Sequence, residues 1–196
     1  MNIIGFSGSP RKGGNTSTLM KEMLKGAQEE EIEVTYIHLP SYHIQGCIGC
    51  EKCRKDKTCT QFLDGMHLLY PLIEKADGII LGSPTYNYTM TPIMKAFIDR
   101  LYPYFDFTEE RPGSYTSRLA KLGKRALIFG VCEQLDEKEM YYNVNVMKQA
   151  IHVVGYEIED SLFFTGHFKA NSASHDEKDL LRAYEAGKSF AQSLKD

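Results

Sequence analysis

The sequence NIIGFSGSPRKGGNTST, residues 2–18, contains a short apolar run, a polar glycine-rich turn and the start of an amphipathic segment. The run at 2–6 has the unbroken apolar character of a strand that is covered on both faces of a parallel sheet. From Thr16 to Gln28 the apolar residues recur on one face of a helix with 3.6 residues per turn. Strand, turn and helix in this order predict the first unit of an α/β fold.

The rest of the chain repeats this alternation. Further apolar runs of the buried-strand type lie at 34–39, 78–82, 125–131 and 156–164. Helix-like segments lie at 64–76, 92–101, 136–154 and 176–194. The helix at 92–101 has a clear beginning, because Thr91 is a good capping residue and Pro92 suits the first helical position.

Five strands alternating with five helices predict one α/β domain over residues 1–196, a three-layer sandwich with a five-stranded, doubly wound parallel sheet. In such a sheet ligands bind outside the carboxyl ends of the strands, at the topological switch point. We therefore expect the chemistry in the loops that follow Phe6, Leu39, Gly82 and Gly130.

Composition narrows the class of protein. Hydrophobic residues make up 42% of the 196 residues and charged residues 25%, as in globular proteins. A net charge of -3 gives no reason to expect nucleic acid or an anionic membrane as a partner. No apolar run approaches the roughly 20 residues of a membrane span. Because Met1 leads directly into a strand-like run without a basic segment, we expect no export signal and a cytoplasmic protein, whose thiols stay reduced.

The turn at 7–18 offers an anion many neutral donors and one cation. Its side-chain donors are the hydroxyls and the amide of Ser7, Ser9, Asn15, Thr16 and Ser17. Glycines let backbone N–H groups turn inward, the following helix N-terminus favours an anion, and Arg11 adds a planar fork suited to phosphate. The spacing is neither that of a Walker loop nor that of a dinucleotide fingerprint. The alternative is a polar surface turn that caps the helix.

The order G-S-P-R-x-x-G-N-T after the first strand resembles the phosphate loop of the flavodoxin-like NADPH-dependent FMN reductase superfamily. The resemblance implies a flavodoxin-like fold and extends from residue 2 to about residue 131. It also implies which side chains hold the phosphate of FMN, namely Ser9, Arg11, Asn15, Thr16 and Ser17, with Ser7 among the cofactor-binding residues.

A second motif, SPTYNY at 83–88, lies where that superfamily holds the isoalloxazine ring, which implies that Pro84, Thr85, Tyr86 and Asn87 bind the flavin. A turn stiffened by proline can present N–H groups to the edge of the ring while an aromatic side chain lines its face. The alternative is a β-turn that leads into a helix. The continuation TPIMKAFIDRL also resembles the superfamily, and we interpret Lys95, Asp99 and Arg100 as structural, a surface charge set or a dimer contact.

The loop at 46–60 contains four of the five cysteines, Cys47, Cys50, Cys53 and Cys59, with the spacing C-x2-C-x2-C-x5-C. The first three have the spacing of bacterial ferredoxins. Within the superfamily the loop resembles that of the iron–sulfur flavoproteins, which implies a 4Fe–4S cluster. Cluster-free thiols and a structural zinc ion are the alternatives, and disulfides are the least expected outcome. Cys132 stands alone and is expected to be a small buried hydrophobe.

Other features are less specific. The aromatic segment at 101–118 is expected to be a lid over the flavin or a dimer arm, or else a packing insertion. We assign no catalytic residue and no catalytic histidine, since a flavin carries the reaction itself. His167 is interpreted as a hydrogen-bonded surface histidine.

The sequence thus predicts an FMN oxidoreductase, and two routes for its electrons are considered. NAD(P)H would deliver them through FMN to a quinone-like or other aromatic acceptor, or to the cluster, in a homodimer or dimer of dimers. The alternative is an iron–sulfur flavoprotein that carries electrons from ferredoxin to a protein or small-molecule acceptor. A zinc-stabilised interaction module is the non-redox alternative.

Overall fold

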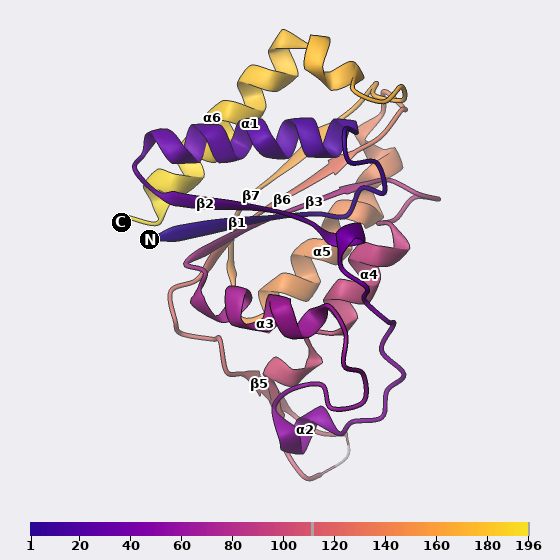
Figure 1. Cartoon of the computed structure of the whole chain (residues 1–196), viewed down its shortest axis with the longest axis vertical. Coiled ribbons are helices and arrows are strands. Elements are labelled where there is room, and N and C mark those ends of the chain that lie inside the picture. The colour runs from indigo at the N-terminus through magenta and orange to yellow at the C-terminus, as the bar shows by residue number, and fades with distance from the viewer. Residues whose placement is uncertain (111, 196) are drawn as a thin grey trace.

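A computed structural model of the chain, described over residues 1–110 and 112–195, contains a five-stranded sheet with helices on both faces (Figure 1). The strands follow the order β2-β1-β3-β6-β7, and all neighbouring pairs are parallel. Their bounds are β1 Asn2–Ser7, β2 Glu33–His38, β3 Gly78–Pro84, β6 Arg125–Val131 and β7 Glu157–Phe164. The predicted doubly wound α/β fold is confirmed.

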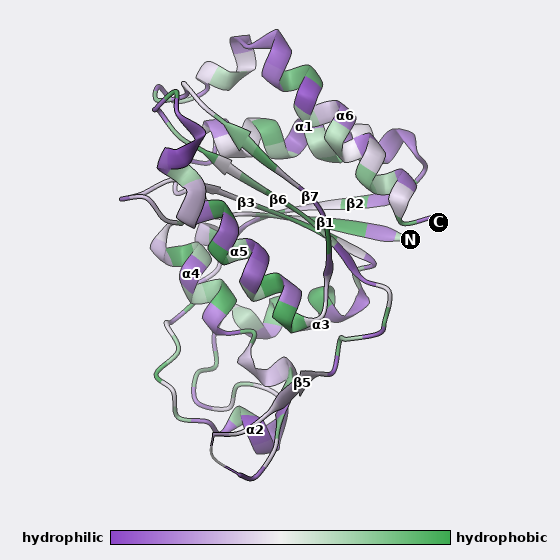
Figure 2. Cartoon of the chain, turned by 180° about the vertical axis from the view of Figure 1, so that it is seen from behind, coloured by the Kyte–Doolittle hydropathy of each residue, from purple (hydrophilic) through white to green (hydrophobic). Residues whose placement is uncertain are grey.

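The helices divide between the two faces as Figure 1 shows. One face carries α1 (Asn15–Glu29) and α6 (Glu177–Ser193), and the other carries α3 (Met66–Lys75), α4 (Pro92–Asp99) and α5 (Tyr141–Val154). Apolar and polar stripes alternate along them (Figure 2). No helix in the described parts of the chain has the length and apolar character of a membrane span.

Short elements complete the chain and shift some predicted bounds. They are the helix α2 (Cys53–Asp56) and the 3-10 turns Leu39–Ser41, Tyr102–Tyr104, Glu137–Met140 and Ser172–His175. Leu39, predicted as strand, starts a 3-10 turn because Pro40 has no N–H to continue the ladder. The helix predicted from residue 136 begins as such a turn, which Asp136 caps by accepting from Lys138 N at 3.0 Å.

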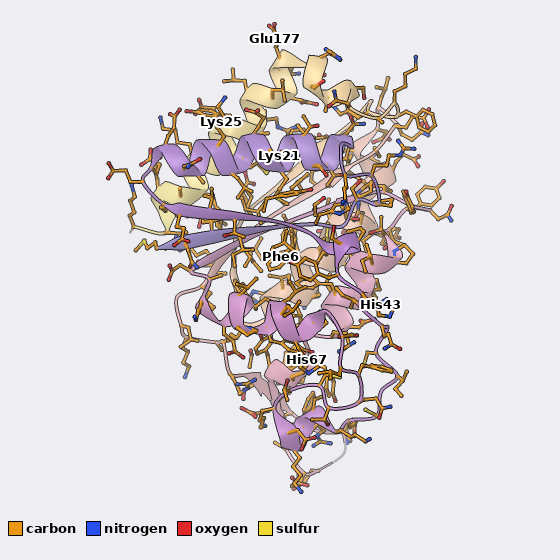
Figure 3. The ribbon with its side chains drawn as sticks, in the orientation of Figure 1. Phe6, Lys21, Lys25, His43, His67 and Glu177 are labelled. Carbon is orange, nitrogen blue, oxygen red and sulfur yellow. The ribbon has the colours of Figure 1, made fainter. Side chains whose placement is uncertain are left out.

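Successive side chains of each strand point to opposite faces of the sheet, and the apolar ones form one core layer on each face. On β1, Ile3 belongs to the layer beneath α1 and α6, whereas Ile4 and Phe6 belong to the layer beneath the other three helices. Phe6 points from the sheet toward α4, where its ring lies 4.9 Å from that of Phe97 (Figure 3). The apolar pattern that marked the strands is therefore the pattern that builds the core.

The segment at 101–118, of which residue 111 is not described, does not form a lid. It contains an antiparallel pair, β4 (Phe105–Phe107) and β5 (Tyr115–Ser117), which the sequence did not indicate. Together with α2 this pair forms a small lobe beyond α3 (Figure 1). Its aromatic rings stack on one another, and Arg54 of α2 lies 5.1 Å from the ring of Phe107. The rings therefore pack within the lobe as the packing alternative predicts, and a role as a dimer arm stays a prediction.

Helices α1 and α6 approach each other backbone to backbone. A methyl group added at Gly187 would lie 1.8 Å from the carbonyl oxygen of Met23, and one added at Gly26 would lie 2.0 Å from that of Tyr184. Any larger residue at these two positions would therefore force the helices apart.

We expect Gly187→Ala to lower the free energy of unfolding by about 1–3 kcal/mol, because the methyl group meets backbone. Helix propensity alone predicts the opposite sign, a gain of about 1 kcal/mol. Urea unfolding followed by circular dichroism measures the change. Gly13→Ala, with no atom within 4 Å of the added group, is the control. A Gly187→Ala protein as stable as the wild type would contradict the close packing.

Candidate functional site

Two predicted motifs face each other across one cavity at the carboxyl edge of the sheet. The cavity has a volume of about 180 Å³. Seven of the predicted flavin-binding residues line it: Ser9, Arg11, Asn15, Thr16, Pro84, Thr85 and Tyr86. The loops after β1 and β3 therefore meet as the parallel topology predicts.

A hydrogen-bond network centred on Thr91 holds these two loops together. Its hydroxyl donates to the carbonyl oxygen of Gly8 at 2.7 Å, and its backbone N–H donates to Ser83 Oγ at 3.1 Å. The same hydroxyl caps α4 by accepting from Met94 N at 3.4 Å, so the predicted cap is confirmed. Gly8 is packed so closely that an added methyl group would lie 2.9 Å from Met94 Cβ. The loops are thus fixed by α4.

The N-terminus of α1 suits an anion. Gly14 is its N-cap and provides no side-chain cap, so the first N–H groups of the helix stay available at the edge of the cavity. An added methyl group at Gly14 would lie 3.0 Å from Arg11 Cβ and 3.1 Å from Ser9 Oγ, which shows how tightly the turn closes. A helix N-terminus, two hydroxyls and a guanidinium form a donor set that fits the phosphate of FMN.

Three predicted residues do not line this cavity. Ser7 is fully buried, and its Oγ accepts from Ser9 N at 3.5 Å. Ser17 is also buried and accepts from the Tyr36 hydroxyl at 2.8 Å. Asn87 lies in the exposed turn after Tyr86, with a left-handed φ of 47°. Ser7 and Ser17 brace the phosphate turn in this structure, and a direct contact of these three with flavin stays a prediction.

The turn at 84–86 is held from below by α5. Asn143 Nδ2 donates to the carbonyl oxygen of Ser83 at 3.1 Å and to Thr85 Oγ1 at 2.9 Å. Tyr86 is 44% exposed and lines both the cavity and a neighbouring groove of about 540 Å³, formed with Pro10, the segment 40–44 and the start of α4. A flat ligand bound at Tyr86 would therefore have space beside it.

Sequence reasoning missed part of the cavity wall. Besides the predicted residues, the wall contains the end of β6 and the loop after β7, namely Val131, Cys132, Glu133, His167 and Phe168. The loop after Gly130 was expected to carry chemistry, but no motif marked the loop after β7. Cys132 is buried as predicted, and burial raises the pKa of its thiol.

His167 is not a surface residue, which corrects the prediction. It is 8% exposed, and its Nε2 lies 2.8 Å from Asp179 Oδ2 of α6. The loop that carries it is tied to the phosphate turn, because Arg11 Nη1 donates to the carbonyl oxygen of Phe168 at 3.1 Å and Asn15 Nδ2 donates to that of Lys169 at 3.0 Å.

The four clustered cysteines line a second cavity of about 230 Å³, in the lobe beyond α3. Cys47 and Cys50 are exposed, Cys53 is half-buried and Cys59 is buried. All four thiols are free. Four thiols that line one cavity form a donor set that fits a compact inorganic cluster.

The thiols of this cavity influence one another. Desolvation, together with the charges of Cys59, Cys47 and Cys50, raises the pKa of Cys53 to about 11. A bound cation would reverse this effect by favouring thiolates. Four thiolates around one zinc ion would lie about 3.8 Å apart, given Zn–S bonds of about 2.3 Å. Among the described residues, no three cysteine sulfurs lie within 4.8 Å of one another in this structure.

Arg100 has the structural role that was predicted, but it is buried and is not part of a surface charge set. Its side chain is 2% exposed and forms a two-pronged ion pair with Asp64, at 2.7 and 3.0 Å. It also donates to the carbonyl oxygen of Gln45 at 2.8 Å, and Gln45 N donates to Asp64 at 2.9 Å. The pair therefore anchors the start of the cysteine loop to α4. Lys95 and Asp99 form an exposed ion pair, as expected.

The two cavities have no lining residue in common. The flavin motifs follow β1 and β3 at the edge of the sheet, whereas α2, which begins at Cys53, lies beyond α3 (Figure 1). Within one chain the flavin cavity and the cysteine cavity are therefore separate sites.

With this geometry established, known proteins provide a comparison. The model of the family described as NADPH-dependent FMN reductase matches residues 1–115. The chain belongs to this family. The matched part includes both flavin motifs and all four cysteines of the loop. The family consists of flavin-dependent oxidoreductases, which agrees with the resemblance seen in the sequence.

Relatives with known names extend the comparison. An iron–sulfur flavoprotein of Archaeoglobus fulgidus is 30% identical over 194 residues, which cover 99% of this chain and 80% of the relative. One of Methanocaldococcus jannaschii is 40% identical over 103 residues, 53% of each chain. Among solved structures, a flavone reductase superposes with a TM-score of 0.74 at 21% identity, covering all of this chain and 64% of the other. This last likeness supports the fold alone.

Asp64→Asn is expected to cost about 3–5 kcal/mol of stability at pH 7, because it leaves Arg100 buried without its countercharge. Burial alone would raise the pKa of Asp64, but hydrogen bonds from Arg100, Gln45 and Met66 outweigh it and lower the pKa. The ionised carboxylate therefore stabilises the fold above its unfolded pKa of about 3.9, and this stability is lost as pH falls through the lower folded pKa.

Urea unfolding at several pH values tests this. The difference between wild type and Asp64→Asn should shrink below about pH 4. Asp99→Asn, in the exposed pair with Lys95, is the matched control and should change stability by at most about 1 kcal/mol. Equal effects of the two substitutions at pH 7 would contradict the structural role of the buried pair.

Proposed function

We propose that the protein is an FMN-dependent oxidoreductase that takes electrons from NAD(P)H and passes them to a quinone-like or other aromatic acceptor, or to an iron–sulfur cluster in the cysteine loop. The observation that carries the proposal is that both flavin motifs line one cavity, with an uncapped helix N-terminus at its edge. Membership of the FMN reductase family supports it.

In this proposal the chain's residues bind and orient the flavin. The N–H groups at the start of α1, the hydroxyls of Ser9 and Thr16 and the guanidinium of Arg11 oppose the phosphate charge. The turn at 84–86, held by Asn143, positions the ring. FMN supplies the redox chemistry, because it accepts two electrons from a hydride and releases them singly or as a pair.

The groove beside Tyr86 is the proposed place for the second flat molecule. It is lined by apolar and aromatic side chains, including Pro40, Tyr42, Ile44 and Ile93. A nicotinamide or an aromatic acceptor could lie there against Tyr86, and a largely apolar groove with few polar groups suits such ligands. A relative named NADPH azoreductase, from a Bacillus strain, is 27% identical over 101 residues and supports this class of donor.

The second proposed function is an electron carrier between ferredoxin and another acceptor. The observation that favours it is the cysteine cavity, with the full set of four thiols that a 4Fe–4S cluster needs. Relatives named iron–sulfur flavoproteins support this assignment. In the proposal Cys47, Cys50, Cys53 and Cys59 hold the cluster, and the anchored start of the loop keeps them together.

A homodimer or dimer of dimers and a cytoplasmic location also remain proposals. Exposed aromatic side chains near the flavin cavity and at the start of α5, such as Tyr86, Tyr88, Tyr141 and Tyr142, would suit an interface between copies.

Because the cavities share no residue, flavin and iron should be lost independently. Cys50→Ala is expected to abolish iron binding and leave the FMN dissociation constant unchanged. Arg11→Ala should weaken FMN binding by about tenfold or more, through loss of a charged phosphate contact, and leave the iron content unchanged. Anaerobic reconstitution, an iron assay and flavin fluorescence titration measure both quantities. A wild-type protein that binds flavin without iron would remove the cluster and keep the reductase.

The electron donor is tested by rapid mixing under anoxia. We expect NADPH or NADH to bleach the flavin absorption within seconds, since the groove beside Tyr86 would give a nicotinamide space next to a bound flavin. Reduced ferredoxin is the matched alternative donor. Bleaching by ferredoxin but by neither nicotinamide would replace the reductase with the electron carrier.

A further inference from the structure

His167 is a buried histidine that the proposed function leaves without a role. It lines the flavin cavity, and its side chain is 4% exposed. Histidine has two ring nitrogens that can form hydrogen bonds. Nε2 is bound to Asp179, whereas Nδ1 has no hydrogen-bond partner in the described part of the chain. One polar atom of the ring is therefore left for a ligand.

The fold fixes the position of this ring. The backbone N–H of His167 donates to the carbonyl oxygen of Cys132 at 2.9 Å, which ties it to the end of β6. Asp179 is itself positioned in the first turn of α6, where its N–H donates to Asp176 Oδ1 at 3.1 Å. The carboxylate thus sets the orientation of the imidazole, in the way that carboxylates orient histidines in metal and catalytic sites.

The neighbours of His167 indicate which end of the flavin it faces. The next two residues accept hydrogen bonds from Arg11 and Asn15 of the phosphate turn. Asn15 Oδ1 also accepts from Ala173 N at 3.1 Å, so the loop 167–173 is attached to this turn at several points. His167 is therefore held at the phosphate end of the cavity.

We infer that His167 is a ligand of the FMN phosphate, with Asp179 as the residue that positions it. In its protonated form the imidazole donates from both nitrogens, from Nε2 to Asp179 and from Nδ1 to a phosphate oxygen. The inference rests on the proposed flavin site and adds to it a residue outside the segment 1–115 that the family model matches. It predicts a preference for FMN over riboflavin, which lacks the phosphate.

Two substitutions of His167 distinguish the contribution of Nε2 from that of Nδ1. The amide of Gln reaches about as far as Nε2 and would keep the contact with Asp179, whereas that of Asn ends near Nδ1 and would keep a donor toward the cavity. His167→Gln is expected to weaken FMN binding about ten- to a hundredfold and to leave riboflavin binding unchanged. His167→Asn should retain more of the FMN affinity. His175→Asn, in the same loop but outside the cavity wall, should change neither.

Fluorescence titration with FMN and with riboflavin gives both affinities for the wild type and the three variants, each as the flavin-free, full-length protein. Equal losses for both ligands in His167→Gln, or no loss, would overturn the inference and leave the flavin proposal intact. A wild-type protein that binds neither ligand would overturn both. If 1 mM EDTA reproduces the loss in the wild type, the group His167, Asp176 and Asp179, whose ligand atoms lie within 4.8 Å, holds a cation and the phosphate contact is wrong.

Nitrogen NMR of the wild type, labelled with 15N-histidine, keeps the inference testable where a variant does not fold. We expect one Nδ1 signal to shift when FMN is added and to stay in place when riboflavin is added. Identical responses to the two ligands would contradict a phosphate contact.

Discussion

The hydroxyl of Thr91 is the interaction on which the predicted flavin cavity depends. It accepts from the first turn of α4 and donates to Gly8, while the adjacent N–H is bound to Ser83. One residue thus links the loop after β1, the loop after β3 and the helix below them. Parallel strands bring the two loops to the same edge, but only such links hold loop backbones at a fixed separation. The short helix α4 therefore fixes the two loops of the cavity, although no residue of α4 lines it.

Much of this arrangement could be predicted from the sequence, because it is encoded locally. The apolar runs and the helical period gave the strands and helices within a few residues, and the two motifs pointed to Ser9, Arg11 and Tyr86. Long-range pairings were not visible. Nothing near Arg100 indicates that its partner is Asp64, 36 positions earlier. His167 was misjudged for a related reason, since its partner Asp179 lies 12 positions later, beyond the turn Ser172–His175.

The cysteine lobe is stabilised differently from the sheet. Its loop is held by the buried Arg100–Asp64 pair and by the packed rings of the 101–118 segment. Arg118 adds a hydrogen bond to the carbonyl oxygen of Lys57 at 3.1 Å. The lobe is thus anchored to the end of α4. The cluster proposed for this loop would add further stability to it, because a bound ligand stabilises the state that binds it.

The glycine contacts between α1 and α6 have an evolutionary consequence. Gly26 and Gly187 lie far apart in sequence, yet each fits against the backbone of the other helix. A recombination event that joined residues 1–115 to a foreign C-terminal half would bring in a helix without a glycine where the backbone of Met23 approaches. The phosphate turn, which leads directly into α1, would then rest on a displaced support. Inheritance of the two halves as one unit is therefore favoured by steric fit alone, before any selection for catalysis.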